Sequence, residues 1–429
     1  MPPDECGIPS VEEMVHQYHV RESTLAAKSA AYPPTSRPSG ESHVNQVAAL
    51  IDSTALLHLH YWIWNTDGNL DRPPSPDAFL ALAQLVEAAA LYDTLVLIPG
   101  WDFGFKYLIT LLERMGIVAR DRAVAKLYYA SRQGPLFEPD AAPRLIATAR
   151  HLYPTAFEDV NRTQDSSYRD FVYDVSAVAI SEEVGLPLIP EATSVPDCVR
   201  IRRELTSHEI GIALQEVYRS ASSEVDDAAR RLSRYSGTLG MTLGPVVLEW
   251  MQIANGLGRR PYPEFFESLL LLRERFEPVR KLFGRLQRVL ADRGACLADR
   301  LEAEARVAEI RSSLQALKDP RGSRVFLLRI ADVRQFLPDL EKLAGGIDGI
   351  LRELGAKQIA WLWRRVRQRQ AFQLFSTTDR ALHSPDAWAA YRGVFGEEPS
   401  QCLVDFLTSH GRRLRAFTAV GGAGTNGAA

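Results

Sequence analysis

Asp52 lies inside an apolar run, ALIDSTALL, and its carboxylate is the side chain in this sequence that most suggests chemistry. Burying a carboxylate is costly unless it is protonated, paired or bound to a cation. At the end of a strand in an open α/β sheet, Asp52 would face the crevice in which ligands usually bind. The alternative interpretation is structural, because an aspartate followed by Ser53 and Thr54 is also typical of a turn or helix cap.

Three further aspartates follow or flank the strands that the sequence predicts. Asp102 follows the second strand, in LVLIPGWDFG, Asp174 lies on the helix that leads to the third strand, and Asp197 follows that strand, in PEATSVPD. Mg²⁺ and Mn²⁺ take oxygen ligands and keep several waters for phosphate chemistry. A bound metal of this kind activates water and stabilises phosphoryl oxygens. We therefore predict one catalytic and metal-binding set: Asp52, Asp102, Asp174 and Asp197.

The elements expected to position these acids alternate along residues 44–200. Apolar, strand-like runs occupy residues 47–64, 94–99 and 186–190. Helical patterns occupy residues 76–93, the second part of 100–118, and 169–185. This alternation predicts a parallel α/β sheet. Parallel strands end at one rim, so Asp52, Asp102 and Asp197 are expected there, with Asp174 on an adjacent helix.

The whole chain is predicted to have four parts. They are a mobile leader with one short helix, an α/β domain, a mainly α-helical domain and a flexible tail, at residues 1–43, 44–200, 201–418 and 419–429. Residues 1–200 carry 15 Lys and Arg against 26 Asp and Glu, whereas residues 201–429 carry 35 against 27. Such an asymmetry indicates either a polyanionic partner or two domains that attract each other, and we favour the second interpretation.

Two stretches of the α/β part resemble the PIN-like nuclease domain. ALIDSTALL is similar to that family's opening strand with its first acid. DVSAVAISEEVGLPLIPEATSVPD is similar to its later Asp-bearing helix, glycine turn, strand and terminal acid. The resemblance implies a PIN-like fold, with a Rossmann-like fold as the alternative. It also implies metal-binding carboxylates at Asp52, Asp174 and Asp197. The family's second acid is usually a Glu that opens the helix after the second strand, where this chain has Asp102 and, before that strand, Glu87.

Basic residues gather near the end of the helical half. RRVRQRQ follows a helical IAWLW segment, in which Trp361 and Trp363 are available to stack on bases. The predicted contacts to RNA or DNA phosphates are Arg364, Arg365, Arg367 and Arg369. The alternative, which we favour, is that both tryptophans belong to the core and the arginines pair with the acidic half.

Other polar residues favour structural interpretations. His58 and His60 would share one face of a strand and could meet a metal, but their aromatic neighbours favour packing. Glu182 and Glu183 are expected on a solvated helix face. The four cysteines are far apart in the sequence, which argues against a zinc ribbon or a disulfide framework and favours a reducing, cytoplasmic environment. The polar N-terminus does not resemble a signal peptide, and no membrane span is expected.

Two classes of function are compatible with these features. The first is a two-part cytosolic protein, in which a PIN-like domain is joined to a helical module that binds a protein partner or a second copy of the chain. Its support is the amphipathic helix predicted at residues 297–319. The alternative is an active nuclease that depends on Mg²⁺ or Mn²⁺ and acts on RNA or DNA. The sequence favours the first slightly, because no catalytic signature is complete.

Overall fold

A computed structural model of the chain describes residues 11–34, 48–100, 105–132, 144–153, 166–218, 244–258, 260–281, 284 and 385–420. Several predictions made from the sequence lie outside these residues. They concern Asp102, Trp361, Trp363 and the four arginines between 364 and 369.

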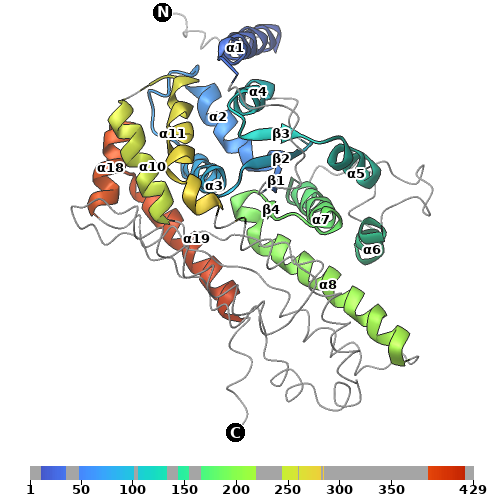
Figure 1. Ribbon diagram of the computed structural model, residues 1–429. Coiled ribbons are helices and arrows are strands. Elements are labelled where there is room, and N and C mark those ends of the chain that lie inside the picture. Colours follow the sequence, from blue (N-terminus) through green and yellow to red (C-terminus); the bar gives the residue numbers. More distant parts are fainter. Residues whose placement is uncertain are drawn as a thin grey trace, which may run out of the picture.

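A parallel sheet of four strands lies at the centre of the described residues (Figure 1). Its strands are β1 (Ala48–Asp52), β2 (Thr94–Ile98), β3 (Val118–Arg120) and β4 (Leu188–Ile189). They are hydrogen-bonded in the order β3-β2-β1-β4, and every pairing is parallel. Every residue of β1 and β2 is buried, as expected for parallel strands covered on both faces. The parallel α/β part of the predicted fold is confirmed.

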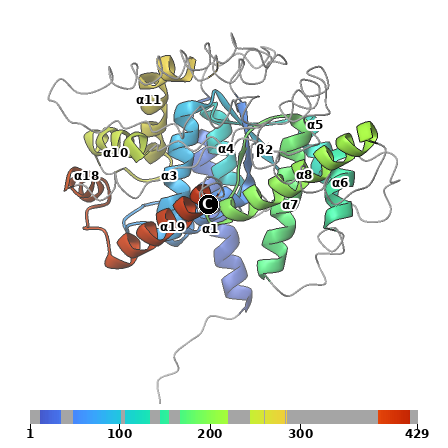
Figure 2. The same ribbon diagram turned by 90° about the horizontal axis from the view of Figure 1, so that it is seen from below.

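Helices cover both faces of the sheet, because alternate residues of β1 and β2 enter two separate apolar clusters. Ala49 and Ile51 of β1 belong to the larger cluster, whereas Leu50 belongs to the smaller one. The larger cluster contains α2 (Leu57–Asn65), α3 (Pro76–Leu91) and α4 (Lys106–Arg114). The smaller one is formed with α5 (Arg122–Arg132), α6 (Arg144–Leu152), α7 (Ser166–Val184) and α8 (Val195–Tyr218). The two helical layers lie on opposite sides of the strands in Figure 2.

The predicted strand-like run at residues 47–64 is wrong beyond Asp52. The chain leaves the sheet there, forms a 3₁₀ turn at Ser53–Leu56 and continues as α2. The carboxylate of Asp52 accepts a hydrogen bond from the backbone N–H of Thr54, at 3.0 Å, and so caps the turn. The capping interpretation of Asp52 is therefore confirmed, and it is compatible with a ligand because a carboxylate has several acceptor sites.

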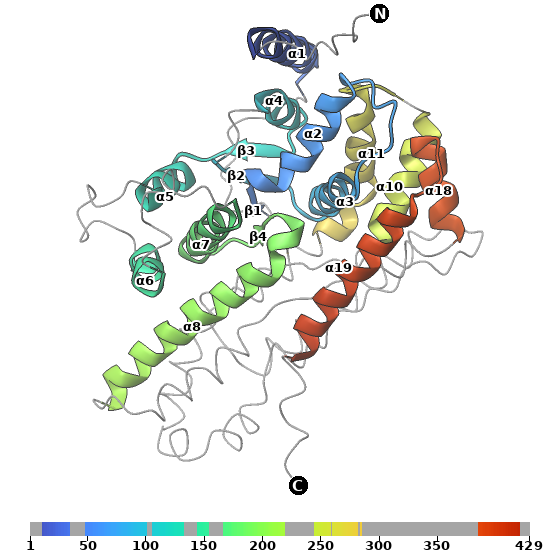
Figure 3. The ribbon, with the colours of Figure 1, turned by 180° about the vertical axis from the view of Figure 1, so that it is seen from behind.

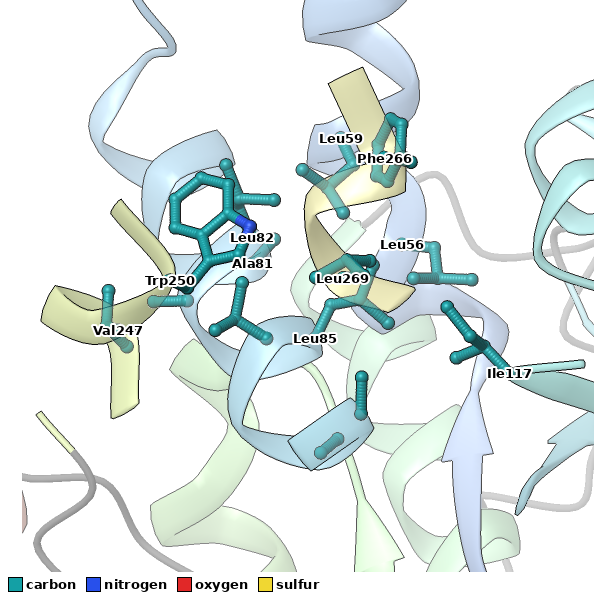
Figure 4. Close-up of a cluster of buried hydrophobic side chains, with 14 of the residues drawn as sticks. Leu56, Leu59, Ala81, Leu82, Leu85, Ile117, Val247, Trp250, Phe266 and Leu269 are labelled. Carbon is teal, nitrogen blue, oxygen red and sulfur yellow. The ribbon is translucent and has the colours of Figure 1, made fainter. Parts of the chain in front are cut away.

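Helix α3 is the centre of the larger cluster. Ser75 caps its first turn by accepting a hydrogen bond from the N–H of Ala78, at 3.2 Å. The helix is apolar on nearly all sides, which requires neighbours all around it. These neighbours include α10 (Gly244–Leu257), α11 (Glu267–Arg275) and α19 (Gln401–Val420). Helix α18 (Pro385–Phe395) packs on α10 and also contacts Phe79 of α3. Figure 4 shows Trp250 of α10 and Leu269 of α11 beside Leu82 and Leu85 of α3.

The described residues beyond 200 are helical, as predicted, but they share their core with the first half. The predicted boundary at residue 200 falls within α8, and the larger cluster runs from Leu25 to Leu407. The expected leader contains α1 (Val11–Ala31), a helix of 21 residues that packs on α4 (Figure 1). In the described part of the chain, no helix combines the length and the apolar composition that a membrane crossing needs.

Candidate functional site

The order of the strands identifies the place where a ligand would bind. From β1 the chain proceeds to β2 and β3 on one side and returns to β4 on the other side. In open α/β sheets, ligands bind outside the carboxyl ends of the strands at such a switch point. Asp52 is the last residue of β1, and Glu191 is the second residue after β4. Helix α7 and the first turn of α8 lie beside the carboxyl ends of these strands, which form the rim of the sheet (Figure 3).

Asp174 of α7 is buried at this rim, with 5% of its surface exposed, and Asp52 is 3% exposed. The Ser194 hydroxyl and the Cys198 thiol lie near the Asp174 carboxylate. Burial raises the pKa of Asp174 well above its usual value, and the charge of Asp52 raises it further. The nearby Ser194 hydroxyl opposes this rise in the pKa. Two buried carboxylates that repel each other in this way form a site that favours a proton or a cation.

Asp197 lies in the first turn of α8 and differs from this pair. Its side chain is 53% exposed, and its Oδ1 accepts a hydrogen bond from Nη2 of Arg200 at 3.0 Å. The helix dipole favours a carboxylate in the first turn of a helix, and this effect alone explains an aspartate at position 197. Its charge still reaches Asp174, whose pKa it raises. Asp197 is thus at the edge of the site rather than inside it.

Among the residues that the structure describes, no three His, Cys, Asp or Glu side chains converge as ligands of one metal ion. Asp52 and Asp174 supply oxygen donors of the kind that Mg²⁺ and Mn²⁺ prefer. Mg²⁺ is commonly held by only one or two carboxylates together with water and substrate phosphates. The donor chemistry and the mutual repulsion of this pair therefore fit a hard divalent cation.

The alternative acid for this site, Glu87, is in the wrong place. It is buried on α3, one turn before that helix ends at Leu91. The helix leads back to the start of β2, so its last turn lies toward the amino ends of the strands. Glu87 therefore lies toward the amino ends of the strands, whereas Asp52 lies at the carboxyl end of β1.

Sequence reasoning missed Glu191 and its pairing with His58. Oε1 of Glu191 is 3.3 Å from Nε2 of His58 and accepts a hydrogen bond from the hydroxyl of Thr193, at 2.8 Å. Burial raises the pKa of Glu191, but these two hydrogen bonds hold it below its usual value. The bond to Glu191 raises the pKa of His58. The only signal in the sequence was the place of Glu191 directly after the LPLIP strand.

The prediction that His58 and His60 share a face is wrong, because α2 is a helix. Residues two apart on a helix point to different sides. His58 reaches the rim, whereas His60 is buried with its Nδ1 2.9 Å from the hydroxyl of Tyr107. Burial lowers the pKa of His60 to about 4, so it is neutral at physiological pH. His60 is a packed core residue.

The prediction that Glu182 is solvated is also wrong. Its side chain is 2% exposed and lies 2.6 Å from Nε of Arg202, in a buried ion pair that joins α7 to α8. Glu183 is exposed, as expected. The ion pair fixes the two helices that carry Asp174 and Asp197 relative to each other.

Gly100, which follows β2, lets the chain approach the rim closely. A Cβ atom at this position would lie 2.6 Å from the hydroxyl oxygen of Ser53. The ends of β1 and β2 therefore pack tightly together.

Comparison of the chain with protein-family models, with curated proteins and with solved structures returned no match in any of the three.

Proposed function

We propose that the protein is a phosphodiesterase that depends on a divalent cation, Mg²⁺ or Mn²⁺, and acts on RNA or DNA through a PIN-like α/β domain. The single observation that carries this proposal is the pair of buried carboxylates, Asp52 and Asp174, at the switch point of a parallel sheet. Capping explains the place of Asp52 but does not require a second buried carboxylate that repels it. A cation between the two carboxylates offsets the cost of that repulsion.

The resemblance to PIN-like domains supports the same proposal. Asp52 and Asp174 are two of the three acids that the resemblance implies as metal ligands, and both are at one rim. Nucleic acid is the proposed substrate because the second half of the chain is basic. The predicted contacts, Arg364, Arg365, Arg367 and Arg369, lie outside the described residues and stay a prediction.

In this function Asp52 and Asp174 hold the cation, and Asp197 adds negative charge at the edge. When bound, such a metal supplies an activated water and stabilises charge on the phosphoryl oxygens. The Thr54 N–H orients the Asp52 carboxylate, and the Ser194 hydroxyl and the Cys198 thiol lie near the Asp174 carboxylate. Because both acids are buried, water is largely excluded around them, which strengthens their interaction with a cation.

The helical interaction module that the sequence suggested has no further support in the described residues. Buried apolar residues of α10, α11, α18 and α19 belong to the larger cluster, and the helix predicted at 297–319 lies outside the described residues. Binding of a protein partner and self-association therefore stay predictions.

Cleavage of end-labelled RNA and DNA oligonucleotides by the full-length protein tests the proposed function. We expect cleavage with Mg²⁺ or Mn²⁺ and none with EDTA. Asp52→Asn and Asp174→Asn should lower the rate at least about 100-fold, because each removes a charged ligand. Asp71→Asn, at an exposed position outside the site, is the matched control and should cleave normally. Metal-independent cleavage, or equal activity in all three variants, would contradict the proposal.

A further inference from the structure

The short segment from Glu191 to Ser194 connects two groups of side chains at the rim. Its first residue, Glu191, is hydrogen-bonded to His58. Its last residue, Ser194, lies near Asp174 and lowers the pKa of that carboxyl group. The charge of Glu191 also acts on Asp174. The pair formed by His58 and Glu191 therefore lies within electrostatic reach of the buried carboxylates, at the same edge of the sheet.

The surroundings of His58 favour a protonated imidazole. Glu191 contacts Nε2 from the segment after β4, and the charge of Asp77 acts on the ring from the first turn of α3. The pKa of His58 is raised above 6.5, mainly by the hydrogen bond to Glu191. The imidazole therefore holds its proton more firmly than an ordinary histidine does.

His58 is also accessible to a substrate. Its side chain is 32% exposed, and that of Glu191 is 20% exposed. His60, the other histidine of α2, is buried and faces Tyr107. Because Nε2 of His58 is directed at Glu191, the other ring nitrogen, Nδ1, is the one that remains for a substrate. A proton donor at the rim beside a carboxylate pair is what the cleavage of an ester with a poor leaving group requires.

We propose that His58, oriented by Glu191, gives the proton to the leaving oxygen in phosphodiester hydrolysis at the carboxylate pair. This inference rests on the proposed function. As the oxygen of water bonds to phosphorus, the P–O bond to the leaving sugar breaks and its electron pair stays on the sugar oxygen. That oxygen takes the proton from Nδ1 of His58. The attacking water loses its own proton to solvent, and solvent protonates the imidazole again. Glu191 is a positioning residue, because it acts through His58.

Two substrates with different leaving groups distinguish this role from a structural one. An RNA oligonucleotide has a sugar alkoxide as leaving group and needs the proton, whereas bis(4-nitrophenyl) phosphate releases a stable phenolate without one. We expect His58→Gln to lower kcat on the oligonucleotide about 100-fold or more. On the nitrophenyl ester, the same variant should stay within about threefold of wild type.

The matched control is His16→Gln, at an exposed histidine of α1, which should behave as wild type on both substrates. Glu191→Gln is the second variant, for the case that His58→Gln does not fold. It should lower oligonucleotide cleavage selectively and move the high-pH limb of the pH profile to lower pH. An equal loss on both substrates by a folded variant overturns the role of His58, as does no loss on either. A wild-type protein that hydrolyses neither substrate overturns the proposed function, and this inference with it.

A spectroscopic titration gives a readout that does not depend on activity. Proton NMR of the imidazole signals, with His58 assigned from the His58→Gln spectrum, should show the His58 resonance titrating above pH 6.5. In Glu191→Gln the midpoint should move down toward the ordinary histidine value. A His58 midpoint that Glu191→Gln leaves unchanged would contradict the positioning role of Glu191.

Discussion

At the scale of single residues, the buried carboxylate of Asp174 has a cost that depends on pH. Its pKa is raised by burial and by the charge of Asp52. The folded state therefore binds the proton more tightly than the unfolded state. The stabilisation from this proton is complete at pH values below the ordinary aspartate pKa and is lost as the pH rises through the raised one.

Replacing Asp174 with Asn removes this dependence. In EDTA, the free energy of unfolding of the wild type should fall by up to about 1.4 kcal/mol per pH unit, relative to Asp174→Asn, as the pH rises from about 4 through the raised pKa. Asp174→Asn should consequently be the more stable protein at pH 7. Urea unfolding of both proteins at several pH values measures the difference. A difference that does not grow with pH would show that the carboxylate is not destabilised by its surroundings.

At the scale of elements, two buried arginines attach α11 and the residues after it to the end of α3. Arg273 donates to the carbonyl oxygens of Ala89, Tyr92 and Asp93, at 3.1, 3.1 and 2.8 Å. Arg280 donates to Oδ1 of Asp93, at 2.9 Å, from the helical residues 277–281 that follow α11. The last carbonyl groups of a helix have no partners within the helix, and a cation is favourable there. Arg280 thus pairs with an acid of the first half, whereas the predicted pairing of the arginines between 364 and 369 lies outside the described residues.

Arg273→Met should destabilise the protein by about 2–4 kcal/mol. It removes charge-assisted hydrogen bonds and leaves buried carbonyl groups that need new partners. The matched control is Arg392→Met, because Arg392 forms an exposed ion pair with Glu398, and such a pair contributes about 1 kcal/mol or less. Denaturant unfolding measures the free energy of unfolding of both variants. Equal decreases in the two variants would contradict the prediction.

The comparison of sequence and structure is also clearest for elements. The patterns at residues 76–93, 94–99 and 169–185 predict α3, β2 and α7, because their apolar periodicity and end signals agree. β1 ends where Asp52 caps a turn, and the apolar residues after it give no sign of the change from strand to helix. β3 has only three residues and no pattern of its own. Local patterns identify long elements, whereas short strands depend on their neighbours in the sheet.

The same limit applies to the site. Asp52 was found because a charge inside an apolar run is unusual, and Asp174 because it lies on a recognisable helix. Glu182 lies on the same helix as Asp174, and Glu191 directly follows the LPLIP strand. Only the packing of α7, α8 and β4 decides which of these acids is buried and which one is exposed. Asp197 satisfied the sequence pattern, but its side chain is exposed at the edge.

At the scale of the whole molecule, the larger cluster joins the two halves of the chain. Leu82 and Leu85 of α3 are completely or almost completely buried, and their neighbours include Trp250 and Leu269 from the second half (Figure 4). Without the later helices, α3 would expose a contiguous apolar surface to water. Exposed apolar patches of this kind lead to association or loss of structure.

A fragment of residues 1–218 should therefore fail to fold cooperatively. It retains every strand of the sheet but lacks α10, α11, α18 and α19. Thermal unfolding by circular dichroism, with the full-length protein measured in parallel, is expected to show no sharp transition for the fragment. A sharp transition near that of the full-length protein would show that residues 44–200 form an independent domain, as their composition suggested.

The most direct test of the central claim measures the binding of a cation to the buried carboxylates. Thermal unfolding of the full-length protein is compared in EDTA, in Mg²⁺ and in Mn²⁺, for wild type, Asp52→Asn, Asp174→Asn and the control Asp71→Asn. At about one hundred times its dissociation constant, a cation adds about 2.7 kcal/mol to the folded state, which raises Tm by a few degrees. The account predicts this rise for wild type and Asp71→Asn, and its loss in the two site variants. An equal rise in all four proteins, or none in any of them, would contradict a cation site at Asp52 and Asp174.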